Sequence, residues 1–159
     1  MPAKLTIETR GDREVVIIRA FNAPRDMVFE AHTKPALLRR WLLGPGDWTM
    51  PVCEIDLRVG GSYRYVWRHA DGREMGMGGV YREIVAPERI VTTELFDEDW
   101  TNGEAVTTLV LTAKGGRTTA VSTVLYSSRA ARDAVLKTPM ADGMEAGYAR
   151  LDELLAQHG

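Results

Sequence analysis

The stretch from Trp48 to Tyr126 constrains the fold of this chain more than any other part of its 159 residues. It has no helical period; runs rich in β-forming residues alternate with short turn sequences such as Gly60-Gly61, Asp71-Gly72 and Gly115-Gly116. Parallel strands need crossover connections of about a dozen residues or more, which these turns do not provide. The spacing therefore predicts an antiparallel meander. Its six strands are residues 48–57, 62–69, 75–85, 89–96, 104–113 and 117–126.

The segment before the meander combines strand and helix. Residues 5–9 and 14–21 are β-rich and form either a hairpin or one bent first strand. Pro24 suits the first turn of a short helix, which Lys34-Pro35 ends. A second short helix follows and is stopped by Gly44-Pro45. We therefore expect two short helices after the first strand.

Helix returns after the meander. Residues 129–137 form one segment, and Pro139 opens a longer helix that runs to about Ala156. A sheet buries its apolar face against such a helix by curling around it, so we expect one α+β domain over residues 1–159. The apolar face of the long helix consists of Met140, Met144, Tyr148, Leu151 and Leu155.

Charge and cysteine content argue against several classes of protein. The net charge of −2 and the pI of about 5.9 disfavour a dedicated nucleic-acid binder. Cys53 is alone, so no internal disulfide forms and a reducing cytoplasm is the natural compartment. The N-terminus lacks an apolar leader, and the run Val15–Ile18 is far shorter than the ~20 residues that span a membrane. We expect a cytoplasmic protein without membrane or nucleic-acid partners.

The predicted strand 62–69 has two distinct faces. Tyr63, Tyr65 and Trp67 alternate with Arg64 and Arg68. The aromatic face must be the concave one, because arginines placed there would be buried without partners. Each ring then either packs in the core or lines a ligand pocket, where phenol hydroxyls and an indole N–H act as polar handles. Tyr65 and Trp67 are the best candidates for such a pocket.

Two neighbouring segments carry methionine and glycine on the same side as a tyrosine. Met77 and Gly79 precede Tyr81 in one strand, and Met144 and Gly147 precede Tyr148 in the last helix. Methionine fills irregular space and glycine leaves space empty. The pattern indicates either close helix–sheet packing or room for a ligand.

Glu94 is the carboxylate of greatest interest. It shares its side of a predicted strand with Ile90 and Phe96, which places it in the interior unless a bulge turns it outward. An inward carboxylate needs a partner such as an arginine, a tyrosine or a ligand. Searches for catalytic or metal motifs fail: the histidines have no zinc spacing, and no P-loop or nucleophile elbow is present. We therefore predict no catalytic residue, metal or cofactor.

A further set of motifs is spread over residues 14–157, namely Ala23-Pro24-Arg25, Val28–Ala31, Leu38, Trp41, Gly44-Pro45, Met50–Gly61, Gly79–Ile84, Pro87–Val91, Gly143-Met144, Tyr148 and Leu151–Leu155. Together they resemble the activator of Hsp-90 ATPase homologue family of the START-like (SRPBCC) superfamily. The resemblance implies a helix-grip fold, in which a curved antiparallel sheet of six to seven strands wraps around a long C-terminal helix and encloses an apolar cavity.

Three functions follow from this resemblance. The first is binding of a hydrophobic or aromatic small molecule in the cavity. The second is a polyketide cyclase-like enzyme, in which Glu94 or a tyrosine does acid–base work. The third is a protein-interaction domain, either a homodimer or, least favoured, a chaperone partner. The lack of convergent acid–base pairs favours binding over catalysis. The expected ligand-binding residues are Trp41, Tyr63, Tyr65, Trp67, Met77, Tyr81, Glu94, Phe96, Met144 and Tyr148.

Overall fold

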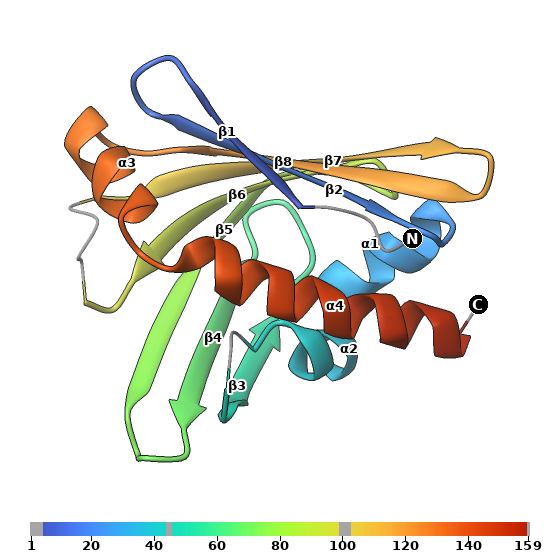
Figure 1. The fold of residues 1–159 in the computed structure, drawn as a ribbon, viewed down its shortest axis with the longest axis horizontal. Coiled ribbons are helices and arrows are strands. Elements are labelled where there is room, and N and C mark those ends of the chain that lie inside the picture. The colour runs from blue at the N-terminus through green and yellow to red at the C-terminus, as the bar shows by residue number, and fades with distance from the viewer. Residues whose placement is uncertain (1–4, 44–45, 99–102, 159) are drawn as a thin grey trace.

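The computed structural model describes residues 5–43, 46–98 and 103–158 and consists of one antiparallel sheet with four helices in that part of the chain (Figure 1). The strand order is β1-β2-β8-β7-β6-β5-β4-β3, and every neighbouring pair is antiparallel. The strands are β1 (Thr6–Arg10), β2 (Glu14–Phe21), β3 (Trp48–Ile55), β4 (Ser62–His69), β5 (Glu74–Val85), β6 (Arg89–Phe96), β7 (Ala105–Lys114) and β8 (Arg117–Leu125).

The predicted meander is confirmed, since β3 to β8 follow one another in both sequence and space. The first two strands complete the sheet by pairing β2 with β8. The sheet has eight strands where six to seven were expected, because Thr6–Arg10 forms a strand of its own. Gly11, with a φ of 56°, occupies the left-handed conformation that the tight turn into β2 requires. The hairpin alternative for the first strands is therefore the correct one.

Four helices accompany the sheet, namely α1 (Arg25–Thr33), α2 (Pro35–Trp41), α3 (Arg129–Leu136) and α4 (Met140–His158). Pro35 is in the first turn of α2, where its missing N–H costs nothing. The Ser128 hydroxyl caps α3 by accepting a hydrogen bond of 3.0 Å from the Ala131 N–H. Gly44-Pro45, expected to stop the second helix, lies outside the described residues.

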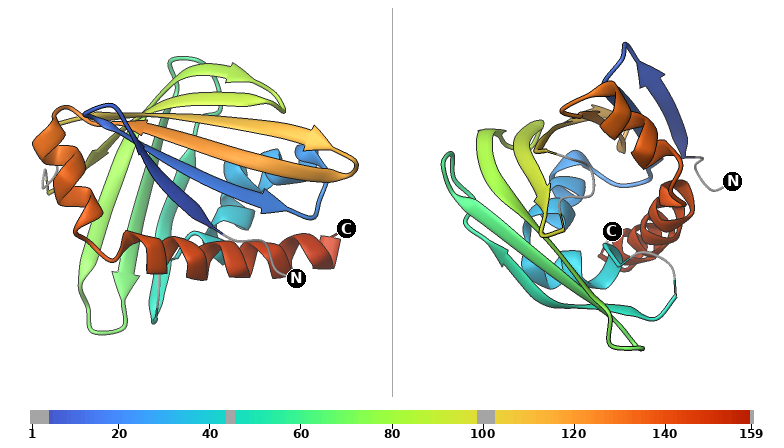
Figure 2. Two further views of the ribbon diagram at one scale, coloured as in Figure 1. Left: turned by 45° about the horizontal axis from the view of Figure 1, so that its top comes forward. Right: turned by 90° about the vertical axis from the view of Figure 1, so that its left-hand side faces the viewer.

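The sheet curls around α4, as the amphipathic pattern predicts (Figure 2). In the end-on view, α1 and α2 lie within the curve of the sheet, and the sheet stays open between its edge strands β1 and β3. Tyr148, Leu151 and Leu155 of the predicted apolar face are buried, whereas Met140 and Met144 are only partly buried. The first turns of α4 therefore pack less completely than the rest of the helix.

A buried arginine, which the sequence analysis did not single out, fastens α4 to β2. Arg19 is 2% exposed, and its guanidinium makes two hydrogen bonds to the Asp152 carboxylate, of 2.6 and 3.1 Å. The same guanidinium lies 5.1 Å from the ring of Phe21 and 5.8 Å from the ring of Tyr148. Arg19 thus joins a central strand, the middle of α4 and an aromatic cluster.

Candidate functional site

A pocket of about 520 Å³ lies between the first turns of α4, the α2 region and strand β4. We call it the aromatic pocket. Its size falls within the range of small-molecule sites, which are roughly 300–1,000 Å³. It occupies the place where the apolar face of α4 is incompletely covered. Its lining consists of His32, Leu38, Trp41, Leu42, Leu43, Trp48, Tyr65, Trp67, Met75, Ser122, Met140, Gly143, Met144, Gly147 and Tyr148.

Five of the ten residues expected to bind ligand line this pocket: Trp41, Tyr65, Trp67, Met144 and Tyr148. The alternation of β4 places Tyr65 and Trp67 on the concave side, while Arg64 and Arg68 face outward and pair with Asp97 and Glu74. The predicted division of β4 into two faces is therefore confirmed. Whether the five residues bind a ligand stays a prediction.

The other five expected residues, Tyr63, Met77, Tyr81, Glu94 and Phe96, are absent from the pocket lining. They lie along the same sheet beyond Tyr65, and the ring of Tyr63 is 5.0 Å from Tyr65 and 5.7 Å from Tyr81. The Tyr63 hydroxyl donates a hydrogen bond of 2.5 Å to the Thr93 carbonyl. This region is packed core next to the pocket.

Gly79 belongs to this packed region. A side chain there would collide with the backbone carbonyl of Thr93, so the glycine permits close approach of strands β5 and β6. Gly147 has a similar role in α4, because a Cβ would lie 3.0 Å from the Trp41 carbonyl oxygen. Of the two explanations considered for these glycines, close packing applies to Gly79, although the close approach is between two strands and not between helix and sheet. For Gly147 both apply, because it also lines the pocket.

Glu94 faces the interior. It pairs in register with buried Ala105, and its carboxylate accepts a hydrogen bond of 3.2 Å from the Thr107 hydroxyl. The outward alternative is wrong, because the bulge lies in β5 between Tyr81 and Glu83 and not at this position. Burial raises the pKa of Glu94, and the hydrogen bond from Thr107 partly offsets that shift.

Two of the three indole N–H groups of the aromatic pocket, those of Trp41 and Trp67, already have partners. Trp67 Nε1 donates to the Leu42 carbonyl at 2.7 Å, and Trp41 Nε1 donates to the Ala31 carbonyl at 2.9 Å. The indole N–H expected from the sequence to serve as a ligand handle, that of Trp67, is thus already engaged within the protein. Instead, these bonds fix the two rings, and Trp41 stacks on Tyr148 with ring centroids 5.8 Å apart. Tyr65 donates no hydrogen bond to any described residue.

His32 is a pocket residue that the sequence analysis considered only as a metal ligand. It is in the last turn of α1, where its Nδ1 lies 2.8 Å from the Val28 carbonyl oxygen and its ring meets the edge of Trp41 at 5.0 Å. Burial lowers the pKa of His32, so the ring is neutral at pH 7. The signal in the sequence was a polar side chain on the apolar face of a helix. No group of three metal-ligating side chains exists among the described residues.

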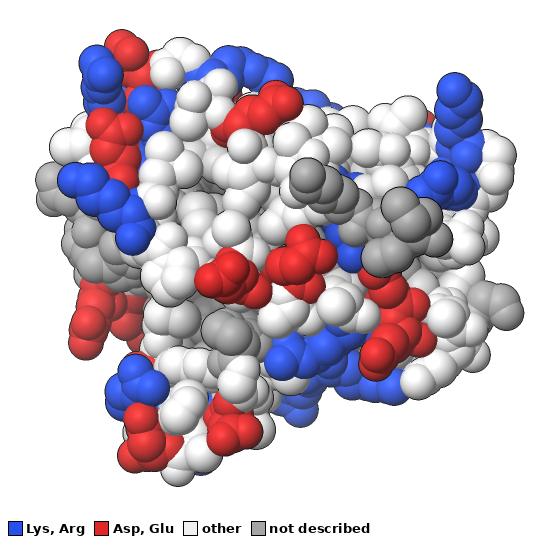
Figure 3. All heavy atoms as spheres, viewed as in Figure 1, with Lys and Arg blue, Asp and Glu red and all other residues white. Residues whose placement is uncertain are grey.

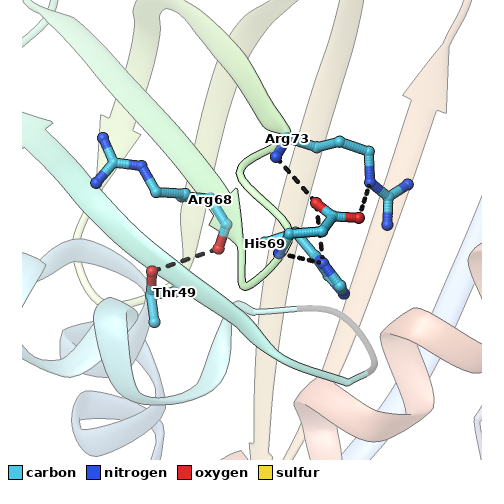
Figure 4. A network of polar contacts seen from close by, with 5 residues as sticks. Thr49, Arg68, His69 and Arg73 are labelled. Carbon is cyan, nitrogen blue, oxygen red and sulfur yellow. Dashed lines mark hydrogen bonds and ion pairs between the residues drawn. The ribbon is translucent and has the colours of Figure 1, made fainter.

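A polar network borders the pocket at the turn between β4 and β5 (Figure 4). Trp48, which lines the pocket, has the ring of His69 at 5.0 Å and the guanidinium of Arg73 at 5.6 Å. Asp71 accepts a hydrogen bond of 2.7 Å from Arg73 Nε, and its own backbone N–H donates to His69 Nδ1 at 3.2 Å. The backbone N–H and the side chain of Arg73 hold the pKa of Asp71 below its usual value. The charges of Asp71 and Arg73 neutralise each other, and the contacts of His69 and Arg73 with the indole ring hold Trp48 in place.

The comparisons with known proteins assign the family. The model of the activator of Hsp90 ATPase homolog 1-like proteins matches residues 22–156. The chain belongs to this family. A search of curated proteins gave no match. The START-like fold expected from the resemblance is confirmed by solved structures.

Several structures have the same fold as this family member. A protein from Rhodobacter sphaeroides is 36% identical, with a TM-score of 0.91 over 97% of this chain and 99% of that one. A Staphylococcus epidermidis protein is 27% identical, with a TM-score of 0.81 over 97% and 95% of the two chains. A Mycobacterium smegmatis protein is 24% identical, with a TM-score of 0.83 over 97% of each. None of the helices in the described ranges is long and apolar enough to cross a bilayer.

Proposed function

We propose that this protein binds an uncharged, largely aromatic small molecule in the aromatic pocket. The observation that supports the proposal is the chemistry of the lining: apolar and aromatic side chains form nearly all of it, and no Asp, Glu, Lys or Arg is among its described residues. Apolar walls with a few polar groups are the usual composition of small-molecule sites. Uncharged walls favour an uncharged ligand, because a buried ion without a partner is costly.

The rigidity of the walls supports binding further. The hydrogen bonds from Trp41 and Trp67 to backbone carbonyls hold both indoles in place, and Tyr148 lies between Trp41 and Arg19. Rings that are already held lose little freedom when a ligand enters, which lowers the cost of binding. A flat aromatic ligand matches these walls best, because offset stacking and edge contacts are favourable between rings.

The other predicted functions have less support. Glu94, the proposed acid or base of a cyclase-like enzyme, is not a lining residue and is bonded to Thr107. A homodimer and a chaperone partner stay predictions. On the face shown in Figure 3, acidic and basic side chains are intermixed, which does not favour a nucleic-acid partner. We place the protein in the cytoplasm, a compartment compatible with the free, buried Cys53.

The test uses N-phenyl-1-naphthylamine, a neutral aromatic probe whose fluorescence rises in apolar surroundings. At one hundred times its Kd, a probe that binds only the folded state stabilises it by about 2.7 kcal/mol. For a chain of this size, that corresponds to a rise in Tm of roughly 5–10 °C. Met144→Trp fills the pocket and should abolish both the fluorescence and the Tm shift while the protein stays folded.

The matched control is Met27→Trp, a helical methionine that is partly buried but lines a different surface groove. It should leave probe binding unchanged. If Met144→Trp is folded and binds the probe as well as the wild type, the pocket is not the binding site. If the wild type shows neither signal, the proposal fails.

A further inference from the structure

One ring nitrogen of His32 is hydrogen-bonded within α1, and the other has no partner among the described residues. Nδ1 lies 2.8 Å from the carbonyl oxygen of Val28, four residues earlier in α1. A carbonyl only accepts hydrogen bonds, so Nδ1 must carry the proton. The ring is neutral at pH 7, because burial lowers the pKa of His32. Nε2 therefore has a lone pair and no hydrogen, and it is an obligate acceptor.

Nε2 has no partner among the described residues, and the ring is positioned at the aromatic pocket. The only hydrogen bond of the His32 side chain in that part of the chain is the one made by Nδ1. The edge contact with Trp41 fixes the plane of the ring. The side chain is partly accessible, and the space it borders is the pocket. Nε2 keeps some accessible surface. Among the described residues, Arg19 Nε is the only side-chain polar atom that is both buried and without a partner.

The other polar groups of the lining are of a different kind. Ser122, Tyr65 and Tyr148 contribute hydroxyls, each of which both donates and accepts, and the indole N–H of Trp48 can only donate. A ligand acceptor or a ligand donor satisfies a hydroxyl equally well, so the hydroxyls discriminate little. An imidazole nitrogen with only a lone pair is satisfied by a donor alone. His32 is therefore the lining side chain that requires a hydrogen-bond donor on the ligand.

Resting on the proposed function, the geometry points to His32 Nε2 as the acceptor for a hydroxyl or N–H group on the bound aromatic ligand. The ligand class is then an uncharged phenol or aryl N–H compound, and its O-methylated or N-methylated analogue binds more weakly. A ligand that covers Nε2 without donating to it leaves that acceptor buried and unsatisfied. This costs more than an average hydrogen bond contributes, so one missing hydrogen on the ligand has a measurable effect on affinity. His32 is a specificity-determining residue with no covalent step assigned to it.

The test compares 2-naphthol with 2-methoxynaphthalene, which have the same aromatic rings and differ in whether the oxygen carries a hydrogen. Their Kd values are measured by displacement of N-phenyl-1-naphthylamine. In the wild type, 2-naphthol should bind roughly tenfold more tightly. In His32→Phe, which keeps an aromatic ring against Trp41, the ratio of the two Kd values should fall by about that factor. Binding of the methyl ether should persist.

Two matched variants test whether another group is the acceptor. Tyr65→Phe and Ser122→Ala remove hydroxyls from the same pocket and should leave the ratio unchanged. Loss of the ratio in either variant, with retention in His32→Phe, would overturn the assignment. Equal affinity for the two probes in the wild type would also overturn it while leaving the proposed function intact. If neither probe binds, the proposed function itself fails, and this inference with it.

A measurement on the wild-type protein covers the case in which His32→Phe does not fold. The two nitrogens of a neutral imidazole have well separated ¹⁵N chemical shifts. NMR should identify Nε2 as the unprotonated nitrogen of His32. When 2-naphthol binds, the ¹⁵N chemical shift of Nε2 should change toward the value of a nitrogen that accepts a hydrogen bond. Binding of 2-methoxynaphthalene should change it much less. A protonated Nε2, or equal shifts with both probes, would contradict the proposal.

Discussion

Glu94 links protonation to folding at the level of a single residue. Burial raises its pKa above the ordinary 4.5, so the folded state binds this proton more tightly than the unfolded state. The resulting stabilisation is complete at pH values below the unfolded pKa and is lost as pH rises through the folded pKa. Each unit of difference between the two pKa values is worth about 1.4 kcal/mol. As pH rises toward neutral, Glu94 therefore lowers the free energy of unfolding.

Glu94→Gln is predicted to remove this cost. The amide oxygen keeps an acceptor for the Thr107 hydroxyl, and no charge forms as pH rises. The variant should match the wild type below the unfolded pKa of 4.5 and exceed it in free energy of unfolding at neutral pH. Urea titrations across that range provide the measurement. Glu8→Gln, on exposed β1, is the control and should leave the pH dependence of the free energy of unfolding unchanged. Parallel curves for Glu94→Gln and the wild type would contradict the prediction.

At the level of elements, α4 has two parts with different tasks. Its later turns bury Leu151, Leu154 and Leu155 against the core, whereas its first turns present Met140 and Met144 to the aromatic pocket. Arg19 of β2 contacts the ring of Tyr148 between these two parts, and its guanidinium pairs with Asp152 in the later turns. The guanidinium is buried and the carboxylate is half-buried, so the strand and the helix cannot shift independently without exposing or isolating the arginine charge.

Asp152→Ala is therefore predicted to destabilise the protein more than Arg19→Met does. Removing Asp152 leaves the buried guanidinium without its closest carboxylate and should cost about 2–4 kcal/mol. Arg19→Met removes the charge together with its desolvation penalty and keeps apolar contact with Phe21 and Tyr148, so its cost should be smaller. Denaturant unfolding of the two variants measures the order. The reverse order would mean that Arg19 contributes mainly through packing.

At the level of the whole molecule, features that depend on local periodicity were predictable and contacts between distant segments were not. Alternation along β4 correctly placed Tyr65 and Trp67 on the concave face, because side chains of a strand point to opposite sides in turn. The partner of the Trp67 indole is Leu42, 25 residues away, and no pattern in either segment encodes that bond. Arg19 on β2 likewise meets its partner across 133 residues.

The same reasoning explains which candidates the pocket gathers. Tyr63 and Tyr65 share a face and a sequence pattern, yet only Tyr65 borders the pocket, because the pocket lies toward the start of α4. The position of a helix along a sheet is set by tertiary packing, and periodicity does not report it. His32 became recognisable as a pocket residue only when its bond to Val28 and its contact with Trp41 were known.

Deleting the edge strand β1 tests how much of the sheet is required to form the aromatic pocket. β1 pairs only with β2, is mostly exposed, and supplies no lining residue. Deleting residues 1–10 removes it but keeps the Gly11 carbonyl, which accepts a hydrogen bond from buried Arg132. We expect a loss of about 1–2 kcal/mol, because Leu5 and Ile7 are the only described residues removed that are even partly buried.

Probe binding in the aromatic pocket should survive this deletion, whereas deleting residues 1–21 should unfold the protein. The longer deletion removes β2, with Val15 and Phe21 at 0% exposure and Arg19 at 2%. Urea unfolding and N-phenyl-1-naphthylamine fluorescence measure the two properties side by side. A folded short deletion that no longer binds the probe would contradict the prediction. It would mean that β1 holds the curvature of the sheet, because a strand that contributes no lining residue can affect the pocket only through the shape of the sheet.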